Sequence, residues 1–228
     1  MFTRGDAVTT HGLYSGKPAG YFGAARLDLL ALLPAERPLR LLELGAGHGA
    51  TLQAAKSSGL ASYAVGVDLV APSATGTPDG LVDEFVVADI EDPAFELPDR
   101  QFDAVLCADV LEHLVDPWST VERAARVLRQ GGWFVASIPN FRNHRALRRI
   151  VCHGDFDYQQ AGLLDRSHLR FFCRRNAIAL LTGAGFSIER VSENMGGYGF
   201  RHRMLDAFML GLAHEFFVFQ FLILARKQ

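Results

Sequence analysis

The stretch LLELGAGHGA at residues 41–50 decides the fold predicted for this chain. Its apolar half is typical of a buried strand, and Gly45, Gly47 and Gly49 fall in the turn between that strand and a helix. Glycines let a backbone pass close under a ligand, and the start of a helix presents unpaired N–H groups. The stretch therefore predicts a ligand-binding turn. It leaves a dinucleotide open, because Gly45, Gly47 and Ala50 also match the pattern G-x-G-x-x-A.

Around this turn, short apolar runs alternate with segments of helical period, which indicates a doubly wound α/β sheet that is mainly parallel and covered on both faces. Residues 71–80 are expected to form a loop, and 140–172 an insertion whose first half is an amphipathic helix with Leu147, Ile150 and Val151 on one side. Strands are expected at 39–44, 63–67, 85–88, 102–108, 133–138, 186–191 and 216–225, and helices at 49–58, from Asp116–Pro117 onward, at 174–184 and near 203–213.

Composition narrows the class of protein. A chain of 228 residues with 49% hydrophobic residues is predicted to form one globular domain with a full core. The net charge of -2 offers no general attraction to nucleic acid. Cys107, Cys152 and Cys173 have no metal-site or disulfide spacing, so a reducing, cytoplasmic location is expected. The longest uncharged stretch near the C-terminus, 216–225, is about half the ~20 residues that span a bilayer, so no membrane span is expected.

Acidic residues stand at or near the ends of several predicted strands. Asp68 ends the second strand, where a carboxylate can accept hydrogen bonds from both hydroxyls of a ribose. Glu43, Asp89, Asp109 and Glu112 occupy corresponding positions on other strands. A crevice lined by carboxylates favours a cationic ligand and would repel a pyrophosphate. This pattern disfavours a nicotinamide dinucleotide.

These motifs, in this order, resemble the class I S-adenosylmethionine-dependent methyltransferases. The resemblance rests on LLELGAGHG, the strand end at Asp68, VVADIED, FDAVLCADVLEHLVDP, VLRQGGWFVASIPN and the late HLRFF with AGF. It implies a Rossmann-like sheet of seven strands, with the strand at 216–225 antiparallel near one edge, and S-adenosylmethionine as cofactor. Residues 155–186 are similar to a subgroup of bacterial small-molecule methyltransferases linked with surface-sugar or natural-product pathways.

The resemblance also implies a set of cofactor-binding residues. The glycine turn would run beneath the methionine part of the cofactor, and Asp68 would bind the ribose. Asp89, after the third strand, would contact the edge of the adenine base. An N-terminal segment at 1–38 would cross the cofactor as a lid, and the insertion at 140–172 would cover the active site. The residues implied are Tyr14, Tyr21, Glu43, Gly45, Ala46, Gly47, Asp68, Leu69, Asp89, Ile90, Ala108 and Asp109.

Two histidines are the catalytic candidates. Methyl transfer from a sulfonium is an in-line displacement, so positioning supplies much of the catalysis and a base is needed only for a protonated acceptor. His168 and His113 could accept such a proton, or could hold the insertion and the cofactor loop in place. His153, Asp155, Asp157 and His168 match no recurring metal-site spacing, so no metal is expected.

The predicted function is therefore methyl transfer to O or N of a small-molecule acceptor. An NAD(P)-dependent oxidoreductase and a non-catalytic cofactor-binding protein are the alternatives. A homodimer is compatible with the sequence. One departure from the resembling enzymes is Cys173, which stands where they commonly have Thr or Ser as a helix N-cap.

Overall fold

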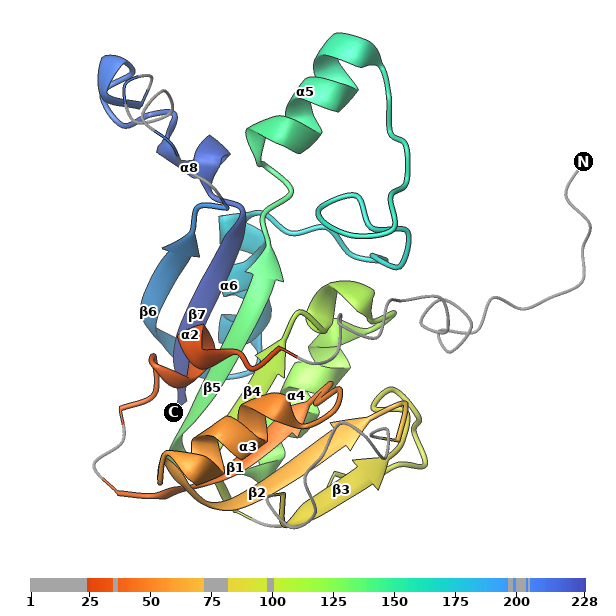
Figure 1. The fold of residues 1–228 in the computed structure, drawn as a ribbon, viewed down its shortest axis with the longest axis vertical. Helices are drawn as coiled ribbons and strands as arrows, with labels where there is room; N and C mark the ends of the chain where they lie inside the picture. Colours follow the sequence, from red (N-terminus) through yellow and green to blue (C-terminus); the bar gives the residue numbers. More distant parts are fainter. Residues whose placement is uncertain are drawn as a thin grey trace, which may run out of the picture.

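A computed structural model describes residues 24–34, 37–71, 82–97, 101–196, 199, 204 and 206–228. Its centre is a sheet of seven strands in the order β3-β2-β1-β4-β5-β7-β6 (Figure 1). The strands are β1 (Leu39–Leu44), β2 (Ala61–Asp68), β3 (Glu84–Val87), β4 (Phe102–Ala108), β5 (Leu128–Pro139), β6 (Phe186–Asn194) and β7 (Gln220–Lys227).

The sheet is parallel except for β7, which runs antiparallel to both β5 and β6. The strand order reverses between β1 and β4. The connections that follow these two neighbouring strands therefore run in opposite directions along the sheet, away from the point where the carboxyl ends of β1 and β4 meet. This architecture confirms the predicted fold class, including an antiparallel strand next to one edge.

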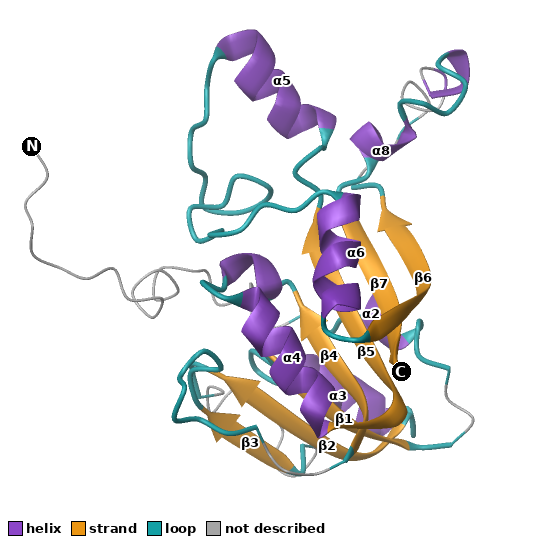
Figure 2. Ribbon diagram, turned by 180° about the vertical axis from the view of Figure 1, so that it is seen from behind, coloured by secondary structure: helices purple, strands orange, loops and turns teal. Residues whose placement is uncertain are grey.

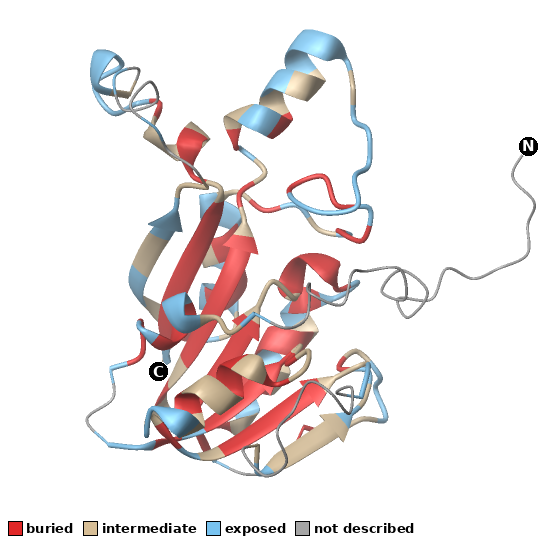
Figure 3. Cartoon of the chain, in the orientation of Figure 1, coloured by how far each residue is buried: buried red, intermediate tan, exposed pale blue. Residues whose placement is uncertain are grey.

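The central strands are buried on both faces, as a parallel sheet requires. Leu42 of β1 lies beside Val65 of β2 and Val105 of β4, and all three side chains are fully buried. Figure 3 shows this core as the buried strands in the middle of the molecule. Helices cover both faces of these strands, which explains why a nearly continuous apolar run such as LLEL forms a buried strand here.

Helices cover the two faces. On one face, α2 (Leu27–Leu30) and α3 (Ala50–Ser57) pack together over β2 and β5 (Figure 1). On the other face, α4 (Pro117–Val127) and α6 (Arg174–Gly183) pack together over β5 and β6, as Figure 2 shows from behind. The predicted start of α4 is confirmed: Pro117 is its first residue, and the Asp116 carboxylate accepts a hydrogen bond of 3.1 Å from the Ser119 N–H.

The structure differs from the sequence prediction near the C-terminus. The strand predicted at 216–225 begins only at Gln220, because the short helix α8 (His214–Phe217) takes up its first residues. The apolar run FFVFQFLIL has no residue that marks this boundary. Part of the helix predicted near 203–213 lies outside the described residues, as does most of the loop predicted at 71–80.

The helix predicted at the start of the insertion is present as α5 (His144–His153), but its apolar side is only partly buried. Val151 is 77% exposed, and Ala146 is the buried residue of this helix. Figure 1 shows α5 standing clear of the sheet, beyond the carboxyl end of β5. Helical period predicts which residues share a side, and it cannot predict whether another element covers them.

The N-cap of α6 offers a stability test. Cys173 occupies the cap position and its side chain accepts no hydrogen bond there. Cys173→Ser should raise the free energy of unfolding by about 1 kcal/mol, because a hydroxyl can accept from an unpaired N–H of the first turn. Urea unfolding measures the change. Cys152→Ser in α5 is the matched control, and an equal effect in both variants would contradict the capping explanation.

Candidate functional site

A cavity of about 380 Å³ lies at the carboxyl ends of the central strands. This volume is within the usual range for small-molecule pockets. Carboxylates dominate its charge, because a single arginine and no lysine accompany them among the described lining residues. The acidic residues that line it are Glu43, Asp68, Asp89, Glu91, Asp109, Glu112 and Asp165.

The glycine turn forms the floor of the cavity. Gly45 has a φ of 71°, and a Cβ added there would come within 2.3 Å of the Val110 side chain. Gly47 has a φ of 54°, which also favours glycine. Its N–H donates a hydrogen bond of 2.7 Å to Oδ2 of Asp68. The turn after β1 is thereby tied to the end of β2, with its backbone against the cavity.

Asp68 is held in place and keeps capacity for a ligand. Oδ2 accepts from Gly47, and Oδ1 accepts from the Val70 N–H at 3.1 Å. The Leu69 N–H also acts on this carboxylate, and a carboxylate offers about four acceptor positions in all, so capacity for a further donor remains. Burial raises the pKa of Asp68 above its ordinary value, and the backbone donors oppose that shift. This arrangement suits a pair of neighbouring hydroxyl donors.

Glu43 is buried at the end of β1. Its Oε2 has no hydrogen-bond partner in the described structure, and its pKa is raised to about 8. Burial is the main cause, and the nearby Asp68 carboxylate adds to it. A hydrogen bond with Thr51 of α3 and the charge of Arg26 oppose the shift. Glu43 therefore carries a proton over much of the neutral range and takes part in the packing of α3.

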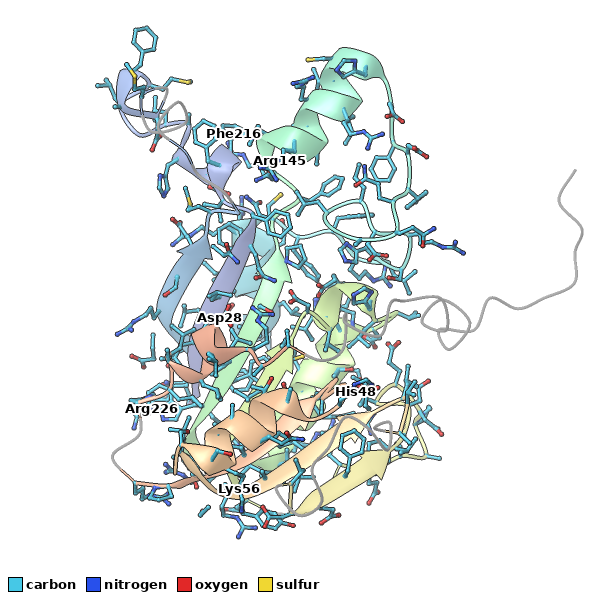
Figure 4. The ribbon with its side chains drawn as sticks, viewed as in Figure 1. Asp28, His48, Lys56, Arg145, Phe216 and Arg226 are labelled. Atoms are coloured by element: carbon cyan, nitrogen blue, oxygen red, sulfur yellow. The ribbon has the colours of Figure 1, made fainter. Side chains whose placement is uncertain are left out.

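Arg26 is a site residue that the sequence prediction missed. It precedes α2 and binds the Asp109 carboxylate, and its Nη1 donates to Ser137 Oγ at 3.0 Å. Asp28, labelled in Figure 4, accepts two hydrogen bonds of 2.9 Å from the same guanidinium. Gln220 at the start of β7 also contacts both Arg26 and Asp109. No motif marks this arginine, because it lies ahead of the glycine turn and reaches the site only through the fold.

Asp109 occupies a strained backbone position directly after β4. Its φ is 54°, which is unusual for a residue other than glycine, and its N–H donates to Ser137 Oγ at 2.9 Å. Burial raises the pKa of Asp109, and Arg26 opposes the shift. Such strain persists where the surrounding contacts fix it, and it is common at functional sites.

Glu112, His113 and His168 form the far wall of the cavity. Glu112 and His113 belong to the short helix η2 (Leu111–His113), and His168 comes from the insertion. All three are buried, and the two rings meet edge to face with centroids 4.7 Å apart. The backbone N–H groups of Leu169 and Arg170 donate to the Glu112 carbonyl, at 2.8 and 2.9 Å. These bonds fix the insertion against η2.

The structure brings the predicted site residues of the described chain together. Tyr14 and Tyr21 lie outside the described residues, so the structure says nothing of them. His113 and His168 share the cavity with the predicted cofactor-binding residues, whose individual roles stay predictions. Those lining residues are Glu43, Gly45, Ala46, Gly47, Asp68, Leu69, Asp89, Ile90, Ala108 and Asp109.

Comparison with known proteins agrees with this geometry. Residues 42–136 match the family described as a methyltransferase domain. The ubiquinone biosynthesis O-methyltransferase of Paracidovorax citrulli is 29% identical over 171 residues, which cover 68% of this chain and 69% of that protein. The enzyme of the same name from Chromobacterium violaceum is 26% identical, with 78% and 80% covered.

Solved structures share the fold at lower identity. An S-adenosylmethionine-dependent methyltransferase from Mesorhizobium loti has a TM-score of 0.61 at 22% identity, with 90% of this chain and 99% of that chain covered. One from Archaeoglobus fulgidus has a TM-score of 0.62 at 18% identity, with 92% and 95% covered. At these identities the likeness establishes the fold.

The matched segment and the curated relatives support methyl transfer from S-adenosylmethionine as the function, and the architecture is that of the class I S-adenosylmethionine-dependent methyltransferases. The cavity fits that cofactor, because a close-approach glycine floor adjoins a lining in which acidic residues outnumber the single arginine, and three buried oxygens of Glu43 and Glu112 have no hydrogen-bond partner in the described structure. Among the described residues, no helix is both long and apolar enough to cross a bilayer.

Glu43 predicts a pH dependence of stability. The folded protein keeps the Glu43 proton up to about pH 8, whereas an unfolded glutamate releases it near 4.5, so stability is lost as pH rises between these values. Glu43→Gln should therefore leave stability unchanged below pH 4.5 and raise it by about 2–4 kcal/mol at pH 8.5. Urea unfolding across this range measures the difference. Glu122→Gln on the exposed side of α4 is the control, and a Glu43→Gln effect independent of pH would contradict this account.

Proposed function

We propose that this protein transfers the methyl group of S-adenosylmethionine to a hydroxyl oxygen of a small-molecule acceptor. The observation that carries the proposal is a single cavity in which the strand-end carboxylates continue into the wall formed by Glu112, His113 and His168. One end of the cavity suits an adenosyl cation, and the other end suits a polar acceptor.

In the proposed complex, Asp68 accepts hydrogen bonds from the ribose hydroxyls, and its place at the end of β2, in the cavity lining and beside the glycine turn, supports this role. Leu69, Asp89 and Ile90 lie around the adenine. The Gly45–Gly47 turn and the backbone at Ala108–Asp109 run beside the methionine part, with Glu43 behind them.

Arg26 is proposed to hold the carboxylate of the methionine part. It is the one guanidinium on the wall of the cavity within the described structure, and it lies at the carboxyl ends of β4 and β5. The methionine ammonium would then face the Asp109 side. Arg26 and Asp109 thus offer a positive and a negative group to the carboxylate and the ammonium of the methionine part, which supports placing that end of the cofactor here.

The acceptor side combines apolar and polar groups. Leu114, Pro139 and Phe219 line it together with the two histidines. An acceptor hydroxyl would lose its proton to a base or to solvent as its oxygen lone pair attacks the methyl carbon. The C–S bond electrons then pass to sulfur, which leaves as a neutral thioether. Transfer to oxygen rather than nitrogen is supported by the names of the curated relatives, which are O-methyltransferases.

Several finer predictions remain proposals. They are an acceptor from a surface-sugar or natural-product pathway, a homodimer, a cytoplasmic location, and roles for 1–38 and 140–172 as coverings of the active site. The insertion is supported in part by its geometry, because Gly162, Asp165 and His168 line the cavity while α5 stands apart from it.

Calorimetric titration tests the cofactor side. S-adenosylhomocysteine should bind with micromolar affinity, and NADH should not bind, because the carboxylates repel a pyrophosphate. Asp68→Asn should weaken S-adenosylhomocysteine binding about 10–100-fold, since it removes a charged acceptor for two hydroxyls. Asp157→Asn in the exposed part of the insertion is the matched control. Tight NADH binding without S-adenosylhomocysteine binding would favour an oxidoreductase instead.

A panel of phenols, sugars and amines, assayed with labelled S-adenosylmethionine, tests the transfer. On an acceptor found in this way, His168→Ala should lower kcat at least tenfold while S-adenosylhomocysteine affinity stays within a few fold, because the side chain faces the acceptor end. Unchanged turnover would remove His168 from the reaction. Tight cofactor binding with no transfer to any acceptor would favour a non-catalytic protein.

A further inference from the structure

Glu112, His113 and His168 have the composition of a metal site. Each offers one ligand atom, and these three atoms lie within 4.8 Å of one another. The residues are 2%, 2% and 7% exposed, and all three line the cavity at its acceptor end. Two imidazoles and one carboxylate that face a cavity are a recurring ligand set for a divalent ion with open coordination positions.

The surroundings of the two imidazoles fit ligation. Nδ1 of His113 lies 3.0 Å from the carbonyl oxygen of Ser167, and Nδ1 of His168 lies 3.4 Å from that of Leu163. A carbonyl oxygen only accepts, so each Nδ1 carries a proton. In the neutral ring the lone pair is then on Nε2. Metal-ligating histidines are usually fixed in this way, by donation from the other ring nitrogen to a carbonyl or carboxylate.

Glu112 supplies an independent observation. Both of its carboxylate oxygens are buried and have no hydrogen-bond partner in the described structure. Charges that act on it include the carboxylates of Asp109 and Asp165 and the guanidinium of Arg26, which itself binds Asp109. A buried carboxylate without donors is costly, and a bound cation would remove that cost.

We propose that Glu112, His113 and His168 bind a divalent first-row transition-metal ion that coordinates the acceptor hydroxyl in the proposed methyl transfer. Two bonds of about 2.1 Å place ligand atoms at most about 4.2 Å apart, so the three groups must close by several tenths of an ångström on binding. Small side-chain rotations supply that movement.

The ion gives the site a way to activate a hydroxyl without a protein base. Coordination lowers the pKa of the hydroxyl, and its proton passes to solvent water. The oxygen lone pair then forms the new bond to the methyl carbon, and the electrons of the broken C–S bond go to sulfur. One proton is released per turnover, and no redox change occurs. In this scheme His113 and His168 are metal ligands and do not act as general bases.

Metal binding can be measured apart from activity. The full chain, without an affinity tag and stripped with EDTA, is titrated with Co²⁺ and with Zn²⁺, by visible absorption and by calorimetry respectively. One ion per chain should bind with micromolar affinity or better. Glu112→Gln and His168→Gln should each weaken binding at least tenfold, whereas His153→Gln in α5 should not, because it lies outside the cavity lining.

S-adenosylhomocysteine affinity within a few fold of the parent protein shows that each variant is folded, and a variant that fails this check is replaced by His113→Gln. No binding of either ion to the parent protein would overturn the proposal, as would equal affinity in the parent protein and both ligand variants. Full methyl transfer by the EDTA-stripped protein would overturn the metal proposal and leave the proposed function intact. One bound ion without S-adenosylhomocysteine binding would contradict the proposed function and retain the metal site.

Discussion

A cluster of buried acidic side chains at the carboxyl ends of β1, β2 and β4 is the constraint on which this site depends. Glu43, Asp109 and Glu112 are removed from water there, and burial raises the pKa of each. Arg26 forms an ion pair with one of these groups, Asp109. A fold tolerates such a cost where a ligand removes it, and a cationic adenosyl sulfonium is suited to do so.

Sheet topology makes this cluster of acidic side chains possible. Because the strand order reverses between β1 and β4, the two strands open a crevice at their carboxyl ends. The glycine turn closes the floor of the crevice, since Gly45 leaves no room for a side chain beside Val110. β7 then brings Gln220 to the edge of the same crevice, where it contacts Asp109. Residues nearly 200 positions apart, Arg26 and Gln220, thereby share one site.

Much of the fold and the cofactor end of the site could be predicted, because strand period and glycine spacing are local signals. Glu43, Asp68 and Asp109 were predictable as acids at strand ends. Arg26 was not, since one arginine ahead of the first strand carries no periodic signal. The grouping of Glu112 and His113 with His168 was also missed, because 55 positions separate the two histidines and only the bonds from the insertion to η2 unite them.

The most direct measurement is a crystal structure of the protein with S-adenosylhomocysteine. The account predicts both ribose hydroxyls within hydrogen-bond distance of Asp68, the homocysteine carboxylate at Arg26, and the sulfur directed toward the wall formed by Glu112, His113 and His168. A ligand seated elsewhere, or Asp68 and Asp109 turned away from the bound molecule, would contradict the claim that this crevice holds the adenosyl sulfonium.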